Sequence, residues 1–134
     1  MATTLKAMDK PAFSLNGTKY EEALFAERLQ RIVDGHDSST PLFLYYAPHI
    51  VHAPYQVPDN YLEKFSFIDD KDRQIYAAMV KYLDDVVGNL TTALKQRGLW
   101  DKLLFITSSD NGGPIFQAAN NFPLRGAKYS NFQG

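Results

Sequence analysis

Cysteine is absent from the 134-residue sequence. Its absence excludes disulfide bonds, zinc–thiolate sites, iron–sulfur clusters and a cysteine nucleophile within these residues. No apolar run approaches the roughly 18 residues that a membrane span requires, because the longest uninterrupted run is Leu42 to Ala47. Neither sign of charge is in excess, since 14 Lys and Arg residues stand against 15 Asp and Glu residues. This balance lacks the basic excess that a nucleic-acid partner would require.

The first residues carry no regular pattern. Residues 1–12 mix Thr, Lys, Asp and Pro without hydrophobic periodicity, which predicts a disordered tail before a single domain over residues 13–134. The stretch 1–10 is also too polar and too short for the apolar core of a secretory signal. Asn16 and Asn89 each begin an N-glycosylation acceptor pattern, which is relevant only in a secretory compartment.

Two amphipathic helices are predicted. Thr18 and Glu21 match the capping box, which predicts a helix over residues 19–34 that ends at Gly35 in the left-handed conformation. From residue 70 to residue 97 the apolar positions keep the i, i+3, i+4 rhythm of a longer helix. Asp69 or Asp70 can cap this helix, and a glycine at position 98 can end it.

Two short apolar runs flank the longer helix. Residues 41–47 and 102–109 predict buried strands, and a strand, a helix and a second strand form a βαβ unit with a right-handed crossover. The fold class is therefore α/β, with a parallel βαβ unit. Both strands would point their carboxyl ends to the same edge of the sheet. His52 follows the first strand on a proline-rich loop, and Asp110 follows the second, so they can converge there.

The residues after the strands can support chemistry. Asp110 and Asn111 offer the hard oxygen donors that Ca²⁺ or Mg²⁺ prefers, although Asn-Gly is also a common turn dipeptide. His52 can donate to an anionic oxygen or act as a general acid, and it can equally be a solvated surface histidine. Lys128 can pair with a sulfate or phosphate oxygen, although most lysines are simply solvated. Each residue alone leaves both interpretations open.

Taken in order, a set of motifs resembles the sulfatase family, and within it the arylsulfatase B-like branch. These motifs are the apolar run 41–47, Val51-His52-Ala53-Pro54, the long helix, Thr107-Ser108-Ser109-Asp110-Asn111-Gly112-Gly113 and Asn120-Asn121-Phe122-Pro123-Leu124-Arg125-Gly126-Ala127-Lys128. The resemblance runs from about Phe13 to the last residue.

The resemblance implies part of an alkaline-phosphatase-like fold and a metal-dependent hydrolase of sulfate esters. By resemblance, Asp110 and Asn111 are ligands of Ca²⁺. His52 contacts the sulfate and helps to protonate the leaving group, and Lys128 binds a sulfate oxygen. The substrate would be a sulfate ester, with a sulfated glycan as one form, and the parent protein would be lysosomal or secreted.

The family's nucleophile motif, Cys/Ser-x-Pro-x-Arg, is missing from the sequence. We therefore expect an internal piece of a sulfatase domain that contributes metal and sulfate contacts and is inactive alone. Two alternatives stay open at this point. One is a non-catalytic pseudoenzyme or interaction module, and the other is a phosphoesterase of the same superfamily.

Overall fold

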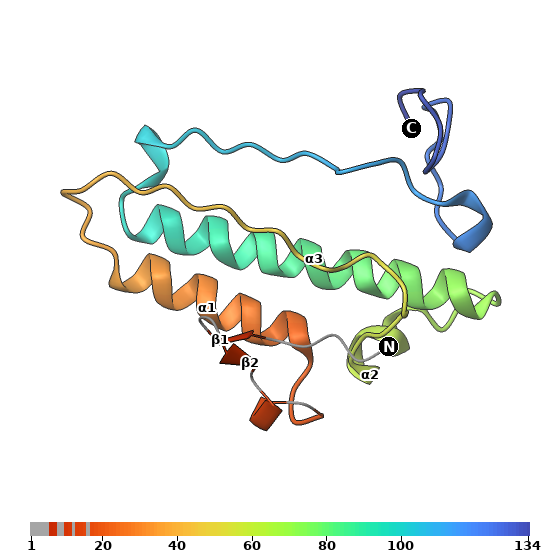
Figure 1. Ribbon diagram of the computed structural model, residues 1–134, viewed down its shortest axis with the longest axis horizontal. Helices are drawn as coiled ribbons and strands as arrows, with labels where there is room; N and C mark the ends of the chain where they lie inside the picture. The colour runs from red at the N-terminus through yellow and green to blue at the C-terminus, as the bar shows by residue number, and fades with distance from the viewer. Residues whose placement is uncertain (1–5, 8–9, 12, 16) are drawn as a thin grey trace.

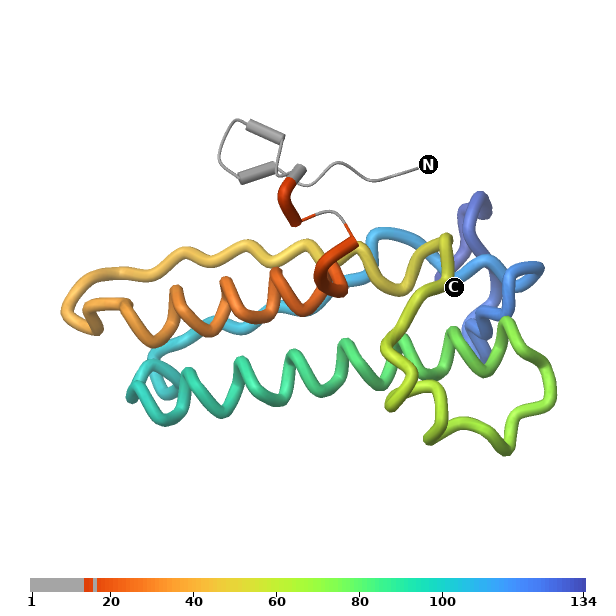
Figure 2. The backbone as a smooth tube through the Cα atoms, turned by 90° about the horizontal axis from the view of Figure 1, so that it is seen from below, coloured from red at the N-terminus to blue at the C-terminus, as the bar shows by residue number. Residues whose placement is uncertain are grey.

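The structure is a computed structural model that describes residues 6–7, 10–11, 13–15 and 17–134. Two long helices, α1 and α3, lie side by side and run in the same direction (Figure 1). The elements in chain order are β1 (Lys6–Ala7), β2 (Lys10–Pro11), η1 (Phe13–Leu15), α1 (Glu21–Gly35), α2 (Asp59–Leu62), η2 (Glu63–Phe65), α3 (Lys71–Gln96), η3 (Trp100–Lys102) and η4 (Ile115–Gln117). Residues 41–56 and 103–113 run as extended segments along these helices, both in the direction opposite to them (Figures 1 and 2).

The core lies between α1 and α3. Val33 of α1 packs with three residues of α3, Leu90, Ala93 and Leu94, and all four are buried. Partly buried apolar side chains close this cluster from the first extended segment and from the turn after α3; they are Leu44, Leu99, Trp100 and Leu103. Burial of such apolar side chains is the main favourable term in folding. The helix pair is thus the frame that carries the extended segments.

The long helix α3 forms as its sequence predicts. Asp70 is the N-cap, and its side chain accepts a hydrogen bond from the backbone N–H of Arg73 at 2.7 Å. Gly98 follows the helix with a φ of +67°. The backbone N–H of Leu99 then reaches back to the carbonyl of Leu94 at 3.0 Å, as in a Schellman motif. Of the two candidate caps, the structure selects Asp70.

Helix α1 forms, but its predicted ends are wrong. The N-cap is Tyr20, which makes no side-chain cap hydrogen bond. Thr18 donates its hydroxyl to the carbonyl of Leu15 instead, so the capping box is absent. The carboxylate of Glu21 is instead paired with a histidine in the first extended segment. Gly35 is the last residue of the helix, and its φ lies outside the left-handed region.

The predicted βαβ unit is not formed. The described part of the chain has one strand pair, in which β1 lies antiparallel to β2. Residues 41–50 and 103–109 are extended but are not assigned to strands, and no backbone hydrogen bond joins one segment to the other. They do run in the same direction, as the crossover argument expects (Figures 1 and 2).

The βαβ unit is missing for a physical reason. An apolar run favours an extended segment covered on one face, but it does not provide the neighbouring strand with which to form backbone hydrogen bonds. Residues 41–50 alternate strictly between exposed and partly buried positions, which is the period-2 pattern of a strand that packs on one face. Their inner face meets the helices, whereas Phe43 on the outer face is 91% exposed. Parallel pairing needs a neighbouring strand at about 4.8 Å. The second segment forms no backbone hydrogen bond with the first, so it is not that neighbour.

Several sequence predictions concern the ends and the surface. The predicted tail, residues 1–12, is described only at residues 6–7 and 10–11, where β1 and β2 pair. Asn16 lies outside the described residues, and Asn89 is exposed on α3. Among the residues described, no helix combines the length and the apolar character that crossing a membrane demands.

Candidate anion site

His52 and Lys128 meet in the folded chain. The Nζ atom of Lys128 lies 3.3 Å from Nε2 of His52, although the two residues are 76 positions apart. On the other side of the ring, Nδ1 of His52 lies 2.8 Å from the carbonyl oxygen of Ala53. Because that carbonyl only accepts, Nδ1 carries the proton and donates, and Nε2 then accepts from the ammonium of Lys128. In this tautomer the lone pair of Nε2 faces the ammonium of Lys128.

This pair suits an oxyanion. An ammonium group and a histidine Nε2 at this distance can each turn toward an oxygen placed between them, and a protonated imidazole would then donate to it as well. His52 is exposed, and Lys128 is partly buried beside Tyr129, whose ring centroid lies 5.7 Å from Nζ. The arrangement can therefore receive an anion from solvent.

The glycine pair that follows Asp110 and Asn111 packs against the segment that carries Lys128. The backbone N–H of Lys128 donates to the carbonyl of Gly113 at 3.4 Å. A Cβ atom built on Gly112 would lie 2.1 Å from the carbonyl carbon of Gly134 and 3.1 Å from that of Ala127. No larger residue fits at position 112 without moving backbone. Here glycine permits the close approach of the C-terminal backbone.

Asn121 fastens these two loops together. Its side-chain amide forms a pair of hydrogen bonds with Gly113, accepting from the N–H at 2.8 Å and donating to the carbonyl at 2.8 Å. The same Nδ2 also lies 3.3 Å from the carbonyl of Gly126. This role of Asn121 was not predicted from the sequence. A signal was present, because Asn121 opens the Pro-Leu-Arg-Gly element, but its partner at position 113 is a backbone group that no side-chain pattern identifies.

Asp110 and Asn111 are exposed at the end of the second extended segment. No hydrogen bond or ion pair joins either of them to His52 or Lys128, all of which the structure describes. Nδ2 of Asn111 donates to the carbonyl of Gly112 at 2.9 Å, which leaves its amide oxygen available. A carboxylate and an amide oxygen have the donor chemistry that Ca²⁺ takes, but they supply at most three of the roughly six to eight oxygens it binds. The two residues fit a calcium ion as part of a larger ligand set.

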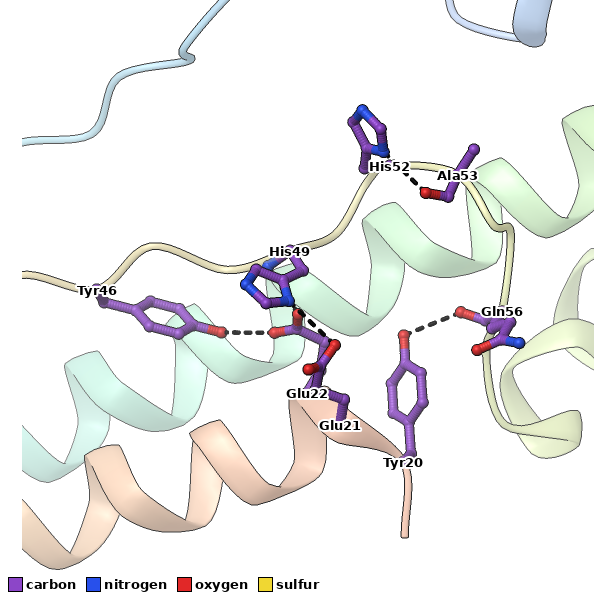
Figure 3. Close-up of polar contacts among 8 residues, drawn as sticks. All are labelled: Tyr20, Glu21, Glu22, Tyr46, His49, His52, Ala53 and Gln56. Atoms are coloured by element: carbon purple, nitrogen blue, oxygen red, sulfur yellow. Dashed lines mark hydrogen bonds and ion pairs between the residues drawn. The ribbon is translucent and has the colours of Figure 1, made fainter. Parts of the chain in front are cut away.

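A charged cluster around the buried Glu22 lies away from this pair, at the start of α1. Glu22 is only 1% exposed, and Oε1 accepts from the backbone N–H of His49 at 2.7 Å (Figure 3). Oε2 accepts from the hydroxyl of Tyr46 at 3.3 Å. Burial raises the pKa of Glu22 above its usual value, and the hydrogen bonds from His49 and Tyr46 oppose that shift. Burial beside this carboxylate also raises the pKa of Tyr46.

Glu21 completes the cluster. Its Oε2 lies 3.0 Å from Nδ1 of His49, while Oε1 is buried without a hydrogen-bond partner. Glu21, Glu22 and His49 bring one ligand atom each to within 4.8 Å of the others. Glu21 pairs with the ring of His49 and Glu22 binds the His49 backbone and Tyr46, whereas Oε1 of Glu21 has no partner among the described residues. The signal for Glu22 was its position, seven residues before Leu29 on the buried stripe of α1, where a carboxylate needs partners.

A sequence model of the family described as "Sulfatase" matches residues 1–134. The chain belongs to the sulfatase family. It is 39% identical to arylsulfatase J of Mus musculus over 126 residues, which are 94% of this chain and 21% of that protein. It is 30% identical to N-acetylgalactosamine-6-sulfatase of Mus musculus over 112 residues, which are 81% of this chain and 20% of that protein.

The fold is that of a part of a sulfatase. The crystal structure of Ps i-CgsB in complex with k-i-k-neocarrahexaose is similar with a TM-score of 0.87 and 36% identity, covering 98% of this chain and 29% of that one. The chain is also 31% identical to bis(5'-adenosyl)-triphosphatase enpp4 of Mus musculus over 88 residues, which are 66% of this chain and 18% of that protein. The chain spans about a fifth of the length of these curated relatives.

Proposed function

We propose that this sulfatase-family chain supplies part of a sulfate-ester site, in which His52 and Lys128 contact the sulfate group. The observation that carries the proposal is the 3.3 Å approach of Lys128 Nζ to His52 Nε2. A sulfate ester is an anion with a poor leaving group, so its hydrolysis requires cationic contacts and a proton donor around one tetrahedral centre. The two side chains match these requirements.

The roles of the two residues follow from their atoms. Lys128 would bind an equatorial sulfate oxygen and offset the charge that builds up in the transition state. His52, once protonated at Nε2, would give that proton to the oxygen of the departing alcohol. Asp110 and Asn111 would hold a Ca²⁺ ion together with ligands from outside this chain, and the ion would supply Lewis-acid polarisation of the sulfate oxygens.

We propose further that the chain is inactive alone. Covalent sulfatase chemistry starts with a nucleophile, and these 134 residues contain neither cysteine nor Ser-x-Pro-x-Arg. The arylsulfatase B-like branch and a sulfated glycan as the substrate also belong to this proposal. The 39% identity to arylsulfatase J supports an arylsulfatase-type parent, and the neocarrahexaose complex of Ps i-CgsB supports a saccharide ligand. A lysosomal or secreted parent rests on the family resemblance and on the acceptor patterns at Asn16 and Asn89.

The experiment measures anion binding and turnover on the purified chain. Titration with sodium sulfate, at ionic strength held constant with chloride, should shift the NMR signals of the His52 ring. Lys128→Ala should weaken sulfate binding by about tenfold, since it removes one charge-assisted contact. Lys102→Ala, an exposed lysine at the opposite end of the second segment, is the matched control and should leave the affinity unchanged.

Two results would contradict the proposal. Equal sulfate affinity in wild type and Lys128→Ala would remove the assigned role of that lysine. Steady hydrolysis of an aryl sulfate by the purified chain with Ca²⁺ would refute the incomplete site. A second candidate, a phosphate-ester site, is favoured by the similarity to the triphosphatase enpp4. Binding of phosphate monoanion in clear preference to sulfate would support it, and a folded chain that binds neither anion would favour a non-catalytic interaction module.

A further inference from the structure

The loop that carries His52 is held on both sides of that residue by Tyr20, the N-cap of α1, and by Glu22 in its first turn. The hydroxyl of Tyr20 donates to the carbonyl of Gln56 at 2.9 Å, four residues after His52 (Figure 3). Glu22 accepts from the backbone N–H of His49 at 2.7 Å, three residues before His52. The loop between these two attachment points contains no helix or strand. Its path therefore depends on contacts with neighbouring elements: α1 holds it at His49 and Gln56, and Tyr55 between them donates to the carbonyl of Gln117 and packs on Tyr76 of α3.

Glu22 is the stronger of the two anchors. Its carboxylate is inside the protein, where an unpaired charge would be costly, and it is retained there by hydrogen bonds to the loop. The bond to Tyr46 at 3.3 Å extends the attachment to the preceding residues of the same segment. Glu22 thus fixes the backbone at residue 49 and the side chain at residue 46, so the segment cannot slide along α1.

The ring of His49 is fixed in its turn. Nδ1 lies 3.0 Å from Oε2 of Glu21, and Phe25 meets the ring edge-on, with centroids 5.4 Å apart and an interplanar angle of 86°. Both partners come from α1, one turn apart. The backbone and the side chain of His49 are therefore both tied to the same helix, and the loop leaves this point toward His52 in a defined direction.

We propose that Glu22, assisted by Tyr20, is a positioning residue that places the imidazole of His52 against Lys128. The inference rests on the proposed sulfate-ester function, because the position of His52 matters for activity only if its ring contacts the sulfate group. No hydrogen bond or ion pair joins Glu22 or Tyr20 to His52 or Lys128, all of which the structure describes, so both act through the backbone of the loop. A shift of about 1 Å at a reacting group can cost two orders of magnitude in rate, which makes such anchoring valuable.

The experiment uses the full chain and compares three variants by NMR. Glu22→Ala removes the acceptor, Glu22→Gln keeps an amide oxygen that can accept from His49, and Tyr20→Phe removes only the hydroxyl. Glu27→Ala is the matched control, since Glu27 is on the same helix but pairs with Lys19 at an exposed site. The measurements are hydrogen exchange at the His49 amide, heteronuclear relaxation at the His52 amide, the thermal midpoint of unfolding and the affinity for inorganic sulfate.

We expect Glu22→Ala to speed exchange at the His49 amide by at least about tenfold, to make the His52 backbone more mobile, and to weaken sulfate binding by at least about fivefold. Glu22→Gln should restore the sulfate affinity to within about twofold of wild type. Tyr20→Phe should show the same changes on a smaller scale. If Glu22→Ala does not fold, the comparison of Tyr20→Phe with Glu27→Ala decides the question.

Folded Glu22→Ala with unchanged exchange at His49 and unchanged mobility at His52 would overturn the inference. So would Glu22→Gln that fails to restore binding although its thermal midpoint matches wild type. The proposed function fails separately, when the wild-type chain shows no response to sulfate at all. In that case exchange at His49 and relaxation at His52, which need no anion, still show whether Glu22 positions the loop.

Discussion

The two extended segments have similar apolar sequences, but they differ in how closely they pack against the helices. In the first, residues 41–50, alternate side chains pack on the helices, and Glu22 binds both Tyr46 and the backbone of His49. In the second, residues 104–111 are all exposed, although the ring of Phe105 lies 5.9 Å from that of Trp100 in η3. The difference shows that an apolar run becomes fixed only where a neighbouring element offers it a partner.

The comparison extends to the candidate site. The first segment leads into the loop of His52, which is anchored on α1, and the second leads to Asp110 and Asn111, which precede the glycine pair that Asn121 binds at Gly113. His52 therefore meets Lys128 in a defined geometry, whereas the candidate calcium ligands stand exposed. The first segment, which is bound to α1, therefore leads to the pair of site residues that are in contact, His52 and Lys128.

The largest expected effect tests the packing of the two segments directly. Leu44→Ala removes a side chain that packs on the core of Val33, Leu90, Ala93 and Leu94. Because Leu44 is partly buried, we expect a loss of about 1 to 3 kcal/mol in the free energy of unfolding, below the range for a fully buried leucine. Leu104→Ala is the matched change in the second segment, at a side chain that is 82% exposed. It should cost less than about 0.5 kcal/mol.

Urea unfolding of wild type and both variants, followed by circular dichroism, gives the measurement. Equal losses in the two variants would contradict the distinction between the segments. They would mean that the second segment also packs against the protein in solution.

The contrast between local and long-range interactions also explains what the sequence could predict. Helix α3 was predictable because its apolar rhythm, the Asp70 cap and Gly98 all act within a few residues. The common direction of the two segments followed from the strand–helix–strand order, because the helix between them returns the chain. The same argument placed His52 and Asp110 at one edge, and the approach of Lys128 to His52 did not follow from it. The sequence predicted a hydrogen-bonded ladder between the two segments, and the structure has none. Such a ladder depends on a neighbouring strand that the residues of a segment do not encode.

The errors at α1 have the same origin. Thr18 and Glu21 have the spacing of a capping box, but Glu21 binds His49 and Thr18 turns toward Leu15. A local motif was overridden by a partner 28 residues away. Glu22 was missed for a related reason, since its partners are a backbone N–H and a tyrosine from another segment. A carboxylate on a buried stripe is a useful signal that such a partner exists.

An intermediate effect concerns the outer faces of both segments. Phe43 and Tyr45 of the first, and Leu104 and Ile106 of the second, are each between 76% and 91% exposed. Extended segments with open backbone groups and apolar side chains tend to pair with other chains. We expect the purified chain to self-associate, and the double variant Leu104→Thr/Ile106→Thr to weaken that association by about tenfold, equivalent to about 1.4 kcal/mol.

Sedimentation velocity over a range of protein concentrations measures this association, and the thermal midpoint serves as the control for folding. Phe43→Thr/Tyr45→Thr is the corresponding variant of the first segment. We expect a smaller change there, because Glu22 of α1 already holds this segment at the side chain of Tyr46 and the backbone of His49. A chain that stays monomeric at high concentration would contradict the exposed faces.

The smallest expected effect is a pH dependence of the anchored segment. Burial raises the pKa of Glu22 in the folded protein, so the folded state binds a proton more tightly than the unfolded state between the ordinary carboxyl pKa and the raised one. The free energy of unfolding should therefore fall as the pH rises through this interval and stay level above it. Glu22→Gln has no proton to lose and keeps an acceptor for His49, so this fall should be absent from its profile.

Urea unfolding of both proteins from pH 4 to pH 8 gives the difference profile, and Glu27→Gln, at an exposed site on the same helix, is the control. A difference between wild type and Glu22→Gln that stays constant across this range would mean that Glu22 titrates like a solvent-exposed carboxyl, and its interior position as the anchor of the first segment would be wrong.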